Sequence, residues 1–290
     1  MTPSALFVGL ATLDVVHAVE RAPAPNEKVT AIWQSVAAGG PAANAAVTFA
    51  ALGGRATLLT ALGGHPVGRA VADELAERDV LVVDSTASAT QLPAVSVVRV
   101  LAGTGERSVS SVNAVGVDAA PPAELGRLVS AADLVLVDGH HPHLAVAAAS
   151  SARSADVPVL LDGGSWKPVL DGLLPLVDAA ICSADFAPPG GLSTVDTLFG
   201  RGVASVAVTH GSDPVEWATG PESGTLPVPQ VPARDTSGAG DAFHGAAAYA
   251  LAGGADWTSA LRFAVRIAAL RVQHPGLREW LSALNGTGAY

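Results

Sequence analysis

Positive charge is scarce in this sequence. The 290 residues include 16 Lys and Arg against 26 Asp and Glu, which gives a formal net charge of −10. Lysine occurs only at Lys28 and Lys167, and basic residues form no run. Binding to a nucleic-acid backbone requires clustered Lys and Arg. The composition therefore argues against nucleic acid as a partner.

Cysteine is also nearly absent, since Cys182 is the only one. A single cysteine excludes an intrachain disulfide and fits a reducing compartment. The first residues lack the basic segment of a signal peptide. The uncharged stretch 29–54 is long enough to span a bilayer, but it carries Gln34 and Asn44, which hydrocarbon disfavours. We expect a cytoplasmic protein that does not associate with membranes.

Charged residues make up only 14% of the chain, whereas hydrophobic residues make up 49%. Both fractions exclude a disordered chain and indicate a large buried core. Short apolar runs predict strands at Leu6–Leu10, Thr57–Ala61, Leu134–Val137, Val157–Leu161, Ala179–Cys182 and Ala204–Val208. Ala-rich segments predict helices at Ala42–Leu52, Val67–Arg78, Pro122–Ser130, Leu144–Ser154, Thr194–Phe199, Ala239–Ala252 and Thr258–Gln273. This alternation predicts an α/β fold with a doubly wound, Rossmann-like parallel sheet.

Two segments interrupt the alternation. Each consists of two stretches with the pattern of antiparallel strands: Asp14–Glu20 with Val29–Gln34, and Pro93–Leu101 with Arg107–Val112. We interpret them as one small β-sheet lid over a cleft. No repeat or linker divides the chain, which we therefore expect to form a single domain over 1–290, with lid strands inserted at about 13–34 and 89–115. Exposed lid edges also predict a homodimer that pairs through the lid.

The segment from Asp235 to Asp241, with the sequence DTSGAGD, precedes a predicted helix. Amide groups of Gly238, Ala239 and Gly240 would point from the helix start, where an anion binds favourably. Asp241 would lie in the first turn. The chain contains no Gly-Lys pair, which excludes a P-loop. On spacing alone, a plain glycine-rich turn with Asp241 as a partner of the helix dipole explains the segment equally well.

A second segment, Gly39-Gly40-Pro41-Ala42-Ala43-Asn44, also leads into a predicted helix. Two glycines permit a ligand to approach the backbone closely. The Asn44 amide can donate hydrogen bonds to hydroxyl groups and accept them. By itself this segment is equally compatible with an ordinary helix start.

Together the two segments resemble the signatures of the ribokinase (PfkB) family of carbohydrate kinases, and the resemblance covers essentially the whole chain. Val8-Gly9-Leu10 followed by Asp14 is similar to the family's opening strand, and Gly105-Glu106-Arg107-Ser108 is similar to its second lid hairpin. Within the family the chain is most similar to the ketohexokinase-like branch, to which Leu261-Arg262-Phe263 also corresponds.

The resemblance implies ATP-dependent phosphorylation of a sugar hydroxyl on a ribokinase-like fold. Asp241 would be the general base, and the amides of Gly238, Ala239 and Gly240 would form the anion hole. The residues implied to bind the sugar are Asp14, Gly39, Gly40 and Asn44, joined by Arg107 from the lid. We also expect His140, in the loop after a buried strand, to contact the substrate.

The resemblance further implies where the nucleotide and the ions bind. Thr209 and Gly211 lie where the family holds the nucleotide, together with Gly238 and Gly240. Mg²⁺ would enter with ATP. A monovalent cation such as K⁺ often binds beside the family's anion hole, and here Asp235 and the main chain of Ser237 would hold it.

Two family patterns are altered in this chain. Gly63-Gly64-His65-Pro66-Val67-Gly68 lacks both acids of Gly-Asp-Asp-x-x-Gly, and Ser183-Ala184-Asp185-Phe186 replaces Asn-x-x-Glu. Three alternatives to a sugar kinase therefore stay open. They are a nucleoside or sugar-phosphate kinase, a sugar sensor without catalysis, and an oxidoreductase. The last is remote because the dinucleotide fingerprint is absent.

Overall fold

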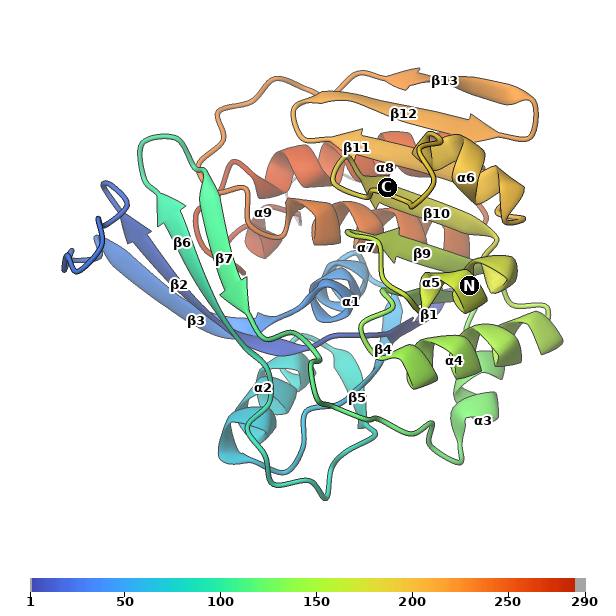
Figure 1. Cartoon of the computed structure of the whole chain (residues 1–290), viewed down its shortest axis with the longest axis horizontal. Helices are drawn as coiled ribbons and strands as arrows, with labels where there is room; N and C mark the ends of the chain where they lie inside the picture. Colours follow the sequence, from blue (N-terminus) through green and yellow to red (C-terminus); the bar gives the residue numbers. More distant parts are fainter. Residues whose placement is uncertain (1, 285–290) are drawn as a thin grey trace.

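The computed structural model describes residues 2–284, and a nine-stranded sheet forms its centre (Figure 1). The strands follow the order β13-β12-β11-β10-β9-β8-β1-β4-β5. Their bounds are β1 Ser4–Val8, β4 Arg55–Thr60, β5 Val80–Asp84, β8 Leu134–Val137, β9 Val159–Gly163, β10 Ala179–Ser183, β11 Ser205–His210, β12 Asp213–Thr219 and β13 Glu222–Leu226. Strand β12 pairs antiparallel with both β11 and β13, and the other pairs are parallel.

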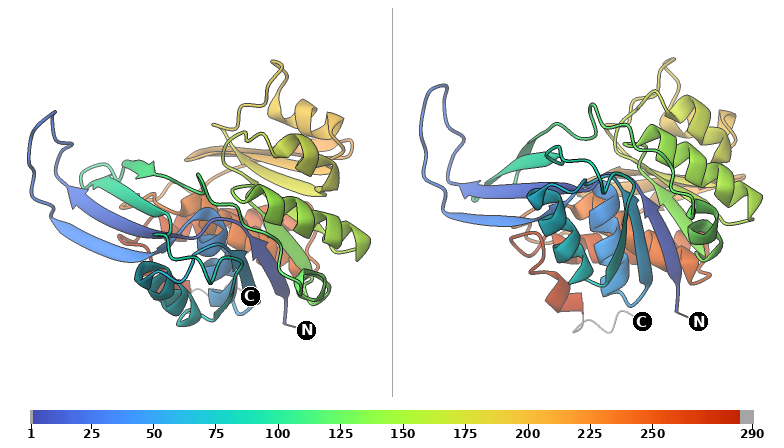
Figure 2. Two further views of the ribbon diagram at one scale, coloured as in Figure 1. Left: turned by 60° about the horizontal axis from the view of Figure 1, so that its bottom comes forward. Right: turned by 90° about the horizontal axis from the view of Figure 1, so that it is seen from below.

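Helices cover both faces of this sheet (Figures 1 and 2). Those packed in one core are α1 Pro41–Ala51, α2 Pro66–Ala76, α7 Ala239–Ala252, α8 Trp257–Arg271 and α9 Leu281–Leu284. Those packed in the other are α3 Leu125–Ser130, α4 Pro142–Ser154, α5 Leu170–Leu173 and α6 Thr194–Gly200. Two helical layers around one parallel sheet confirm the predicted doubly wound fold.

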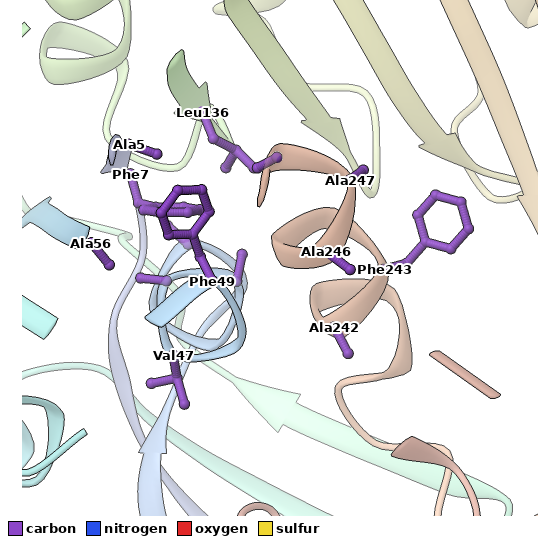
Figure 3. Close-up of a cluster of buried hydrophobic side chains, with 14 of the residues drawn as sticks. Ala5, Phe7, Val47, Phe49, Ala56, Leu136, Ala242, Phe243, Ala246 and Ala247 are labelled. Carbon is purple, nitrogen blue, oxygen red and sulfur yellow. The ribbon is translucent and has the colours of Figure 1, made fainter. Parts of the chain in front are cut away.

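Four successive residues of strand β1, from Ala5 to Val8, are apolar because both faces of the strand are buried. Neighbouring side chains of a strand point to opposite faces, so Phe7 enters one core and Leu6 and Val8 enter the other. Figure 3 shows Phe7 beside Phe49 of α1, and the two rings meet edge to face with centroids 5.4 Å apart. Burial on both faces excludes the polar–apolar alternation of an exposed strand.

A separate four-stranded sheet, in the order β3-β2-β6-β7, projects from the core as a lid (Figure 2). Its strands are β2 Thr12–Val19, β3 Trp33–Gly39, β6 Val95–Leu101 and β7 Arg107–Ser111. The predicted strand at Val29–Gln34 was wrong in position. The observed strand begins at Trp33 and continues to Gly39, because β3 pairs with β2 as far as Thr12.

The structure also bears on membrane association. No helix within residues 2–284 combines the length and the apolar character needed to cross a bilayer. The uncharged stretch 29–54 instead forms a lid strand followed by a core helix.

Candidate active site

A cleft of about 450 Å³ opens between the lid and the carboxyl ends of the parallel strands. The chain proceeds from β1 to β4 on one side and reaches β8 on the other, so the strand order reverses between β1 and β8. Ligands of open α/β sheets bind at such a reversal point. The lid contributes Asp14 and Arg107 to the walls, and the core contributes Asn44 and Asp241.

The floor of the cleft is the start of α7. Gly238 is the N-cap and adopts a φ of 68°, a left-handed conformation that glycine tolerates best. Among the described residues, the amides of Gly238 and Gly240 donate to no acceptor, whereas the Ala239 amide donates to the Thr236 carbonyl at 3.3 Å. A Cβ at Gly240 would meet nothing within 4 Å. Two of the three predicted amides are therefore free to bind an anion.

Asp241 lies in the first turn of α7, where its Oδ2 accepts a 2.8 Å hydrogen bond from Asn44 Nδ2. Burial raises the pKa of Asp241, and the negative charge of Asp162 raises it further. The Asn44 hydrogen bond and the charges of His244 and Arg107 act in the opposite direction. The helix terminus alone favours the ionised form of Asp241. The structure adds desolvation, which increases the proton affinity that a general base needs.

Asn44 is held by Arg278, a residue that the sequence analysis missed. Arg278 Nη1 donates to Asn44 Oδ1 at 3.0 Å, and its other nitrogens donate to the Ala38 carbonyl and to Glu74 at 2.7 and 3.0 Å. Because the oxygen of the Asn44 amide faces a guanidinium, its nitrogen must face Asp241. Arg278 therefore positions Asn44 for its contact with Asp241.

The double glycine accommodates Asp14. A Cβ at Gly39 would lie 2.0 Å from the Asp14 carboxyl carbon, and one at Gly40, where φ is +93°, would lie 2.4 Å from the Leu10 carbonyl oxygen. Thr12 Oγ1 donates a 2.5 Å hydrogen bond to Asp14 Oδ1. Burial raises the pKa of Asp14 in spite of this bond. Gly39 thus leaves room for the Asp14 carboxyl group, and Gly40 leaves room for the backbone of Leu10.

The lid touches the anion-hole loop directly. Arg107 Nη1 donates to the Thr236 carbonyl at 2.7 Å, and Thr236 Oγ1 donates to the Gly105 carbonyl at 3.1 Å. These bonds join β7 to the segment before α7. They place Arg107 at the wall of the cleft, beside the free amides of Gly238 and Gly240.

The other predicted residues are divided between the cleft and its surroundings. His140 and Thr209 line the cleft, and burial lowers the pKa of His140 so that the neutral ring is favoured. Gly211 lies in the exposed turn between β11 and β12 and does not line the cleft. Ser237 lines it, and its Oγ is buried without a protein partner among the described residues. That hydroxyl is available to a ligand.

Behind the anion hole lies a buried pair, Asp162 and His244, with Nε2 of the imidazole 3.5 Å from Oδ1 of the carboxyl group. The imidazole also lies 2.7 Å from the Gly240 carbonyl through Nδ1 and 3.1 Å from the Ile181 carbonyl through Nε2. Burial raises the pKa of Asp162. Contacts at both nitrogens fix the ring against the first turn of α7. No sequence pattern pointed to His244.

Replacing Asp162 with asparagine is expected to shift the acid limb of the kcat/KM profile to lower pH. As the predicted general base, Asp241 would act only when ionised, so its raised pKa would move the loss of activity on acidification to higher pH than for an ordinary aspartate. Removing the Asp162 charge lowers the pKa of Asp241. Rates measured from acid to neutral pH for wild type and Asp162→Asn test this.

A matched control for that profile is Asp185→Asn. Asp185 also lines the cleft, but its charge is not among the influences on Asp241. This variant should retain the wild-type limb. Identical limbs for Asp162→Asn and wild type would show that Asp162 does not tune the base.

Comparison with known proteins places this geometry in context. A model described as pfkB family carbohydrate kinase matches residues 2–283. The ribokinase of Bacillus subtilis (strain 168) is 28% identical over 277 residues, which cover 91% of each chain. The ribokinase of Arabidopsis thaliana is 30% identical over 294 residues, covering 94% of this chain and 77% of that one. The solved structure of Arabidopsis thaliana ribokinase complexed with ribose and ATP has a TM-score of 0.79, 25% identity, and coverage of 98% and 99%.

Proposed function

The chain belongs to the pfkB family of carbohydrate kinases, and on this basis we propose that it transfers the γ-phosphoryl group of ATP to a primary hydroxyl of a small sugar, with a pentose as the first candidate. The relatives at 28% and 30% identity are ribokinases, which favours a pentose over a ketohexose. They do not address the narrower resemblance to ketohexokinases, which stays a prediction.

The hydrogen bond between Asn44 and Asp241 carries the proposal. It joins two motifs that lie 197 residues apart in the sequence. Asn44 belongs to the segment expected to bind sugar hydroxyls, and Asp241 adjoins the free amides of Gly238 and Gly240. A hydroxyl held by Asn44 and Asp14 would lie beside both a base and an anion-binding helix start.

Each group has a defined part in the proposed transfer. Asp14 and Asn44 orient the sugar, and Asp241 accepts the proton of the attacking hydroxyl. The amides of Gly238 and Gly240 stabilise the charge that develops on the transferred phosphoryl group. The nucleotide substrate is Mg-ATP. Since no cluster of three or more acidic, His or Cys side chains in residues 2–284 suits a metal ion, we expect the phosphates to carry most of the magnesium coordination.

The walls of the cleft bear on the alternative substrates. A nucleoside base is normally stacked on an aromatic ring, yet no Phe, Tyr or Trp among the described residues lines the cleft. Trp33, the lid residue with an aromatic ring, packs against the apolar core of the lid. A sugar is therefore favoured over a nucleoside.

The proposal is tested by measuring the release of ADP from Mg-ATP over a panel of candidate substrates. The panel contains pentoses, ketohexoses, aldohexoses, sugar phosphates and nucleosides. We expect turnover with at least one free sugar, and the highest kcat/KM with a pentose. Turnover restricted to nucleosides or sugar phosphates would replace the substrate class. Sugar binding by calorimetry without ADP release from any compound would favour the sensor.

The lid supports the predicted homodimer. Val36 and Val97 both lie opposite Val15 on one face of the sheet, and they are 59% and 51% exposed. A second copy of the chain would cover these valines. Static light scattering over a concentration series should give twice the 28.8 kDa chain mass. A monomer mass at every concentration would contradict pairing through the lid.

A further inference from the structure

Arg271, the last residue of α8, is buried directly behind the anion-hole loop. Its side chain is only 1% exposed, and its Nη2 lies 3.1 Å from Oδ2 of Asp235, whose side chain is fully buried. Its Nε lies 4.0 Å from the position that a Cβ on Gly238 would occupy. A guanidinium keeps its charge in proteins, so a fixed positive charge supports this loop.

The groups around the guanidinium are oxygen acceptors of the kind that alkali cations prefer. Besides the Asp235 carboxylate, Nη1 donates to the main-chain carbonyl of His274 at 2.9 Å and to that of Asp235 at 3.4 Å. One carboxylate and two carbonyl oxygens form a typical donor set for a hard cation. In this chain a tethered guanidinium uses that set.

Both oxygens of the Asp235 carboxylate already have donors in the protein. Oδ1 accepts from the Ser237 amide at 2.8 Å, and Oδ2 accepts from Arg271 and from the Gly276 amide at 3.1 Å each. A further cation would face the charge of Arg271 with no unpaired carboxylate to offset it. Because Arg271 already neutralises the Asp235 carboxylate, the site predicted for K⁺ at Asp235 and the main chain of Ser237 does not fit a second cation.

We propose that the guanidinium of Arg271 replaces the activating monovalent cation, so that turnover by this enzyme does not depend on K⁺. The proposal rests on the proposed kinase function only where turnover is the readout. The tethered charge stays beside the anion hole at every salt composition. An exchangeable ion would do so only when its concentration sufficed.

The direct test compares initial rates in choline chloride, NaCl and KCl at one ionic strength, with Mg-ATP and the accepting sugar. We expect the three rates to agree within about twofold, a barrier difference well below the 1.36 kcal/mol of a tenfold change. A kinase of this family that requires K⁺ serves as the positive control. Activation of the wild type by more than about fivefold in KCl would overturn the proposal.

Removing the guanidinium provides a second test. Arg271→Ala should lose about 10- to 100-fold in kcat in choline chloride, as expected when a buried charge loses its partner. Added guanidinium or K⁺ should restore much of that loss by occupying the vacated site. Arg262→Ala, on the exposed face of the same helix, is the matched control and should remain insensitive to both ions.

The outcomes for Arg271→Ala are interpreted only after circular dichroism shows a folded protein, and Arg271→Lys is used if it is not. Full activity in choline chloride would overturn the proposal, because the guanidinium would then be dispensable. A folded variant that stays inactive at all concentrations of guanidinium and K⁺ would also overturn it.

Thermal unfolding gives a readout that is independent of turnover. The melting temperature of the wild type with ADP should be equal in KCl and choline chloride, whereas that of Arg271→Ala should be higher in KCl. A wild-type protein stabilised specifically by K⁺ would contradict the proposal. If no sugar supports turnover, the proposed function fails, but these melting temperatures still decide whether the cation site is occupied by Arg271.

Discussion

Asp241→Asn is expected to lower kcat by about 10²- to 10⁴-fold, the range typical of a lost general base. Asparagine has the shape of aspartate, and its side-chain oxygen can still accept the hydrogen bond from Asn44 Nδ2. It cannot take the proton of the attacking hydroxyl at neutral pH. Steady-state ADP release at saturating sugar measures this effect.

Sugar affinity separates lost catalysis from a damaged site in that variant. Calorimetric titration should give Asp241→Asn a Kd for sugar within a few fold of the wild type, because Asp14 and Asn44 remain in place. Asp213→Asn, which removes an exposed carboxylate that does not line the cleft, should keep nearly full kcat. Turnover of Asp241→Asn at the wild-type rate would remove Asp241 from the mechanism.

Asp14→Ala is expected to lower kcat/KM by about 10²-fold or more, since hydrogen bonds to a charged group contribute about 1.5–3 kcal/mol each and a carboxylate can bind two hydroxyls. Asp14 lines the cleft, where its carboxyl group accepts a hydrogen bond from Thr12 and occupies the space left by the missing side chain of Gly39. The loss should appear mainly in KM, because the proposed base and the proposed anion hole are unchanged. Kinetics over a range of sugar concentrations separates the two constants.

A serine on the same lid supplies the control for Asp14→Ala. Ser110 lies opposite Val97 on the outer side of the lid and is exposed, so Ser110→Ala should leave both constants unchanged. An unaltered KM for Asp14→Ala would show that the sugar is not held by this carboxyl group. A lower kcat at unchanged KM would instead connect Asp14 to the chemical step.

The buried parallel strands could be predicted from the sequence, whereas the antiparallel strands β12 and β13 could not. Strands such as β8 are apolar at every position because helices cover both faces. Strand β5 is short and half-exposed at one edge, and β12 and β13 carry exposed polar residues at the other. The patterns of β12 and β13 resemble those of loops, whereas the apolar run of β5, VLVV, was predictable and was overlooked.

The candidate site was predictable where residues lie close together in the sequence. The helix start from Gly238 to Asp241 and the pair Gly39-Gly40 are local patterns with a local physical reason. Arg278 and Arg271 escaped prediction because each acts through a partner distant in the sequence: Arg278 through Asn44, 234 residues away, and Arg271 through Asp235, 36 residues away. The structure adds a second reason for the double glycine, because Asp14 and Leu10 of this chain also approach it closely.

The most direct measurement is the rate at which labelled phosphate is transferred from γ-labelled ATP to the accepting sugar. It is made in a single turnover with enzyme in excess, for the wild type and for Asp241→Asn. We expect the wild type to form labelled sugar phosphate in one fast phase. The variant should bind both substrates and form the same product at least about 10²-fold more slowly. Equal transfer rates for the two proteins, or label released only as inorganic phosphate, would contradict the assignment of Asp241 as the base of a sugar kinase.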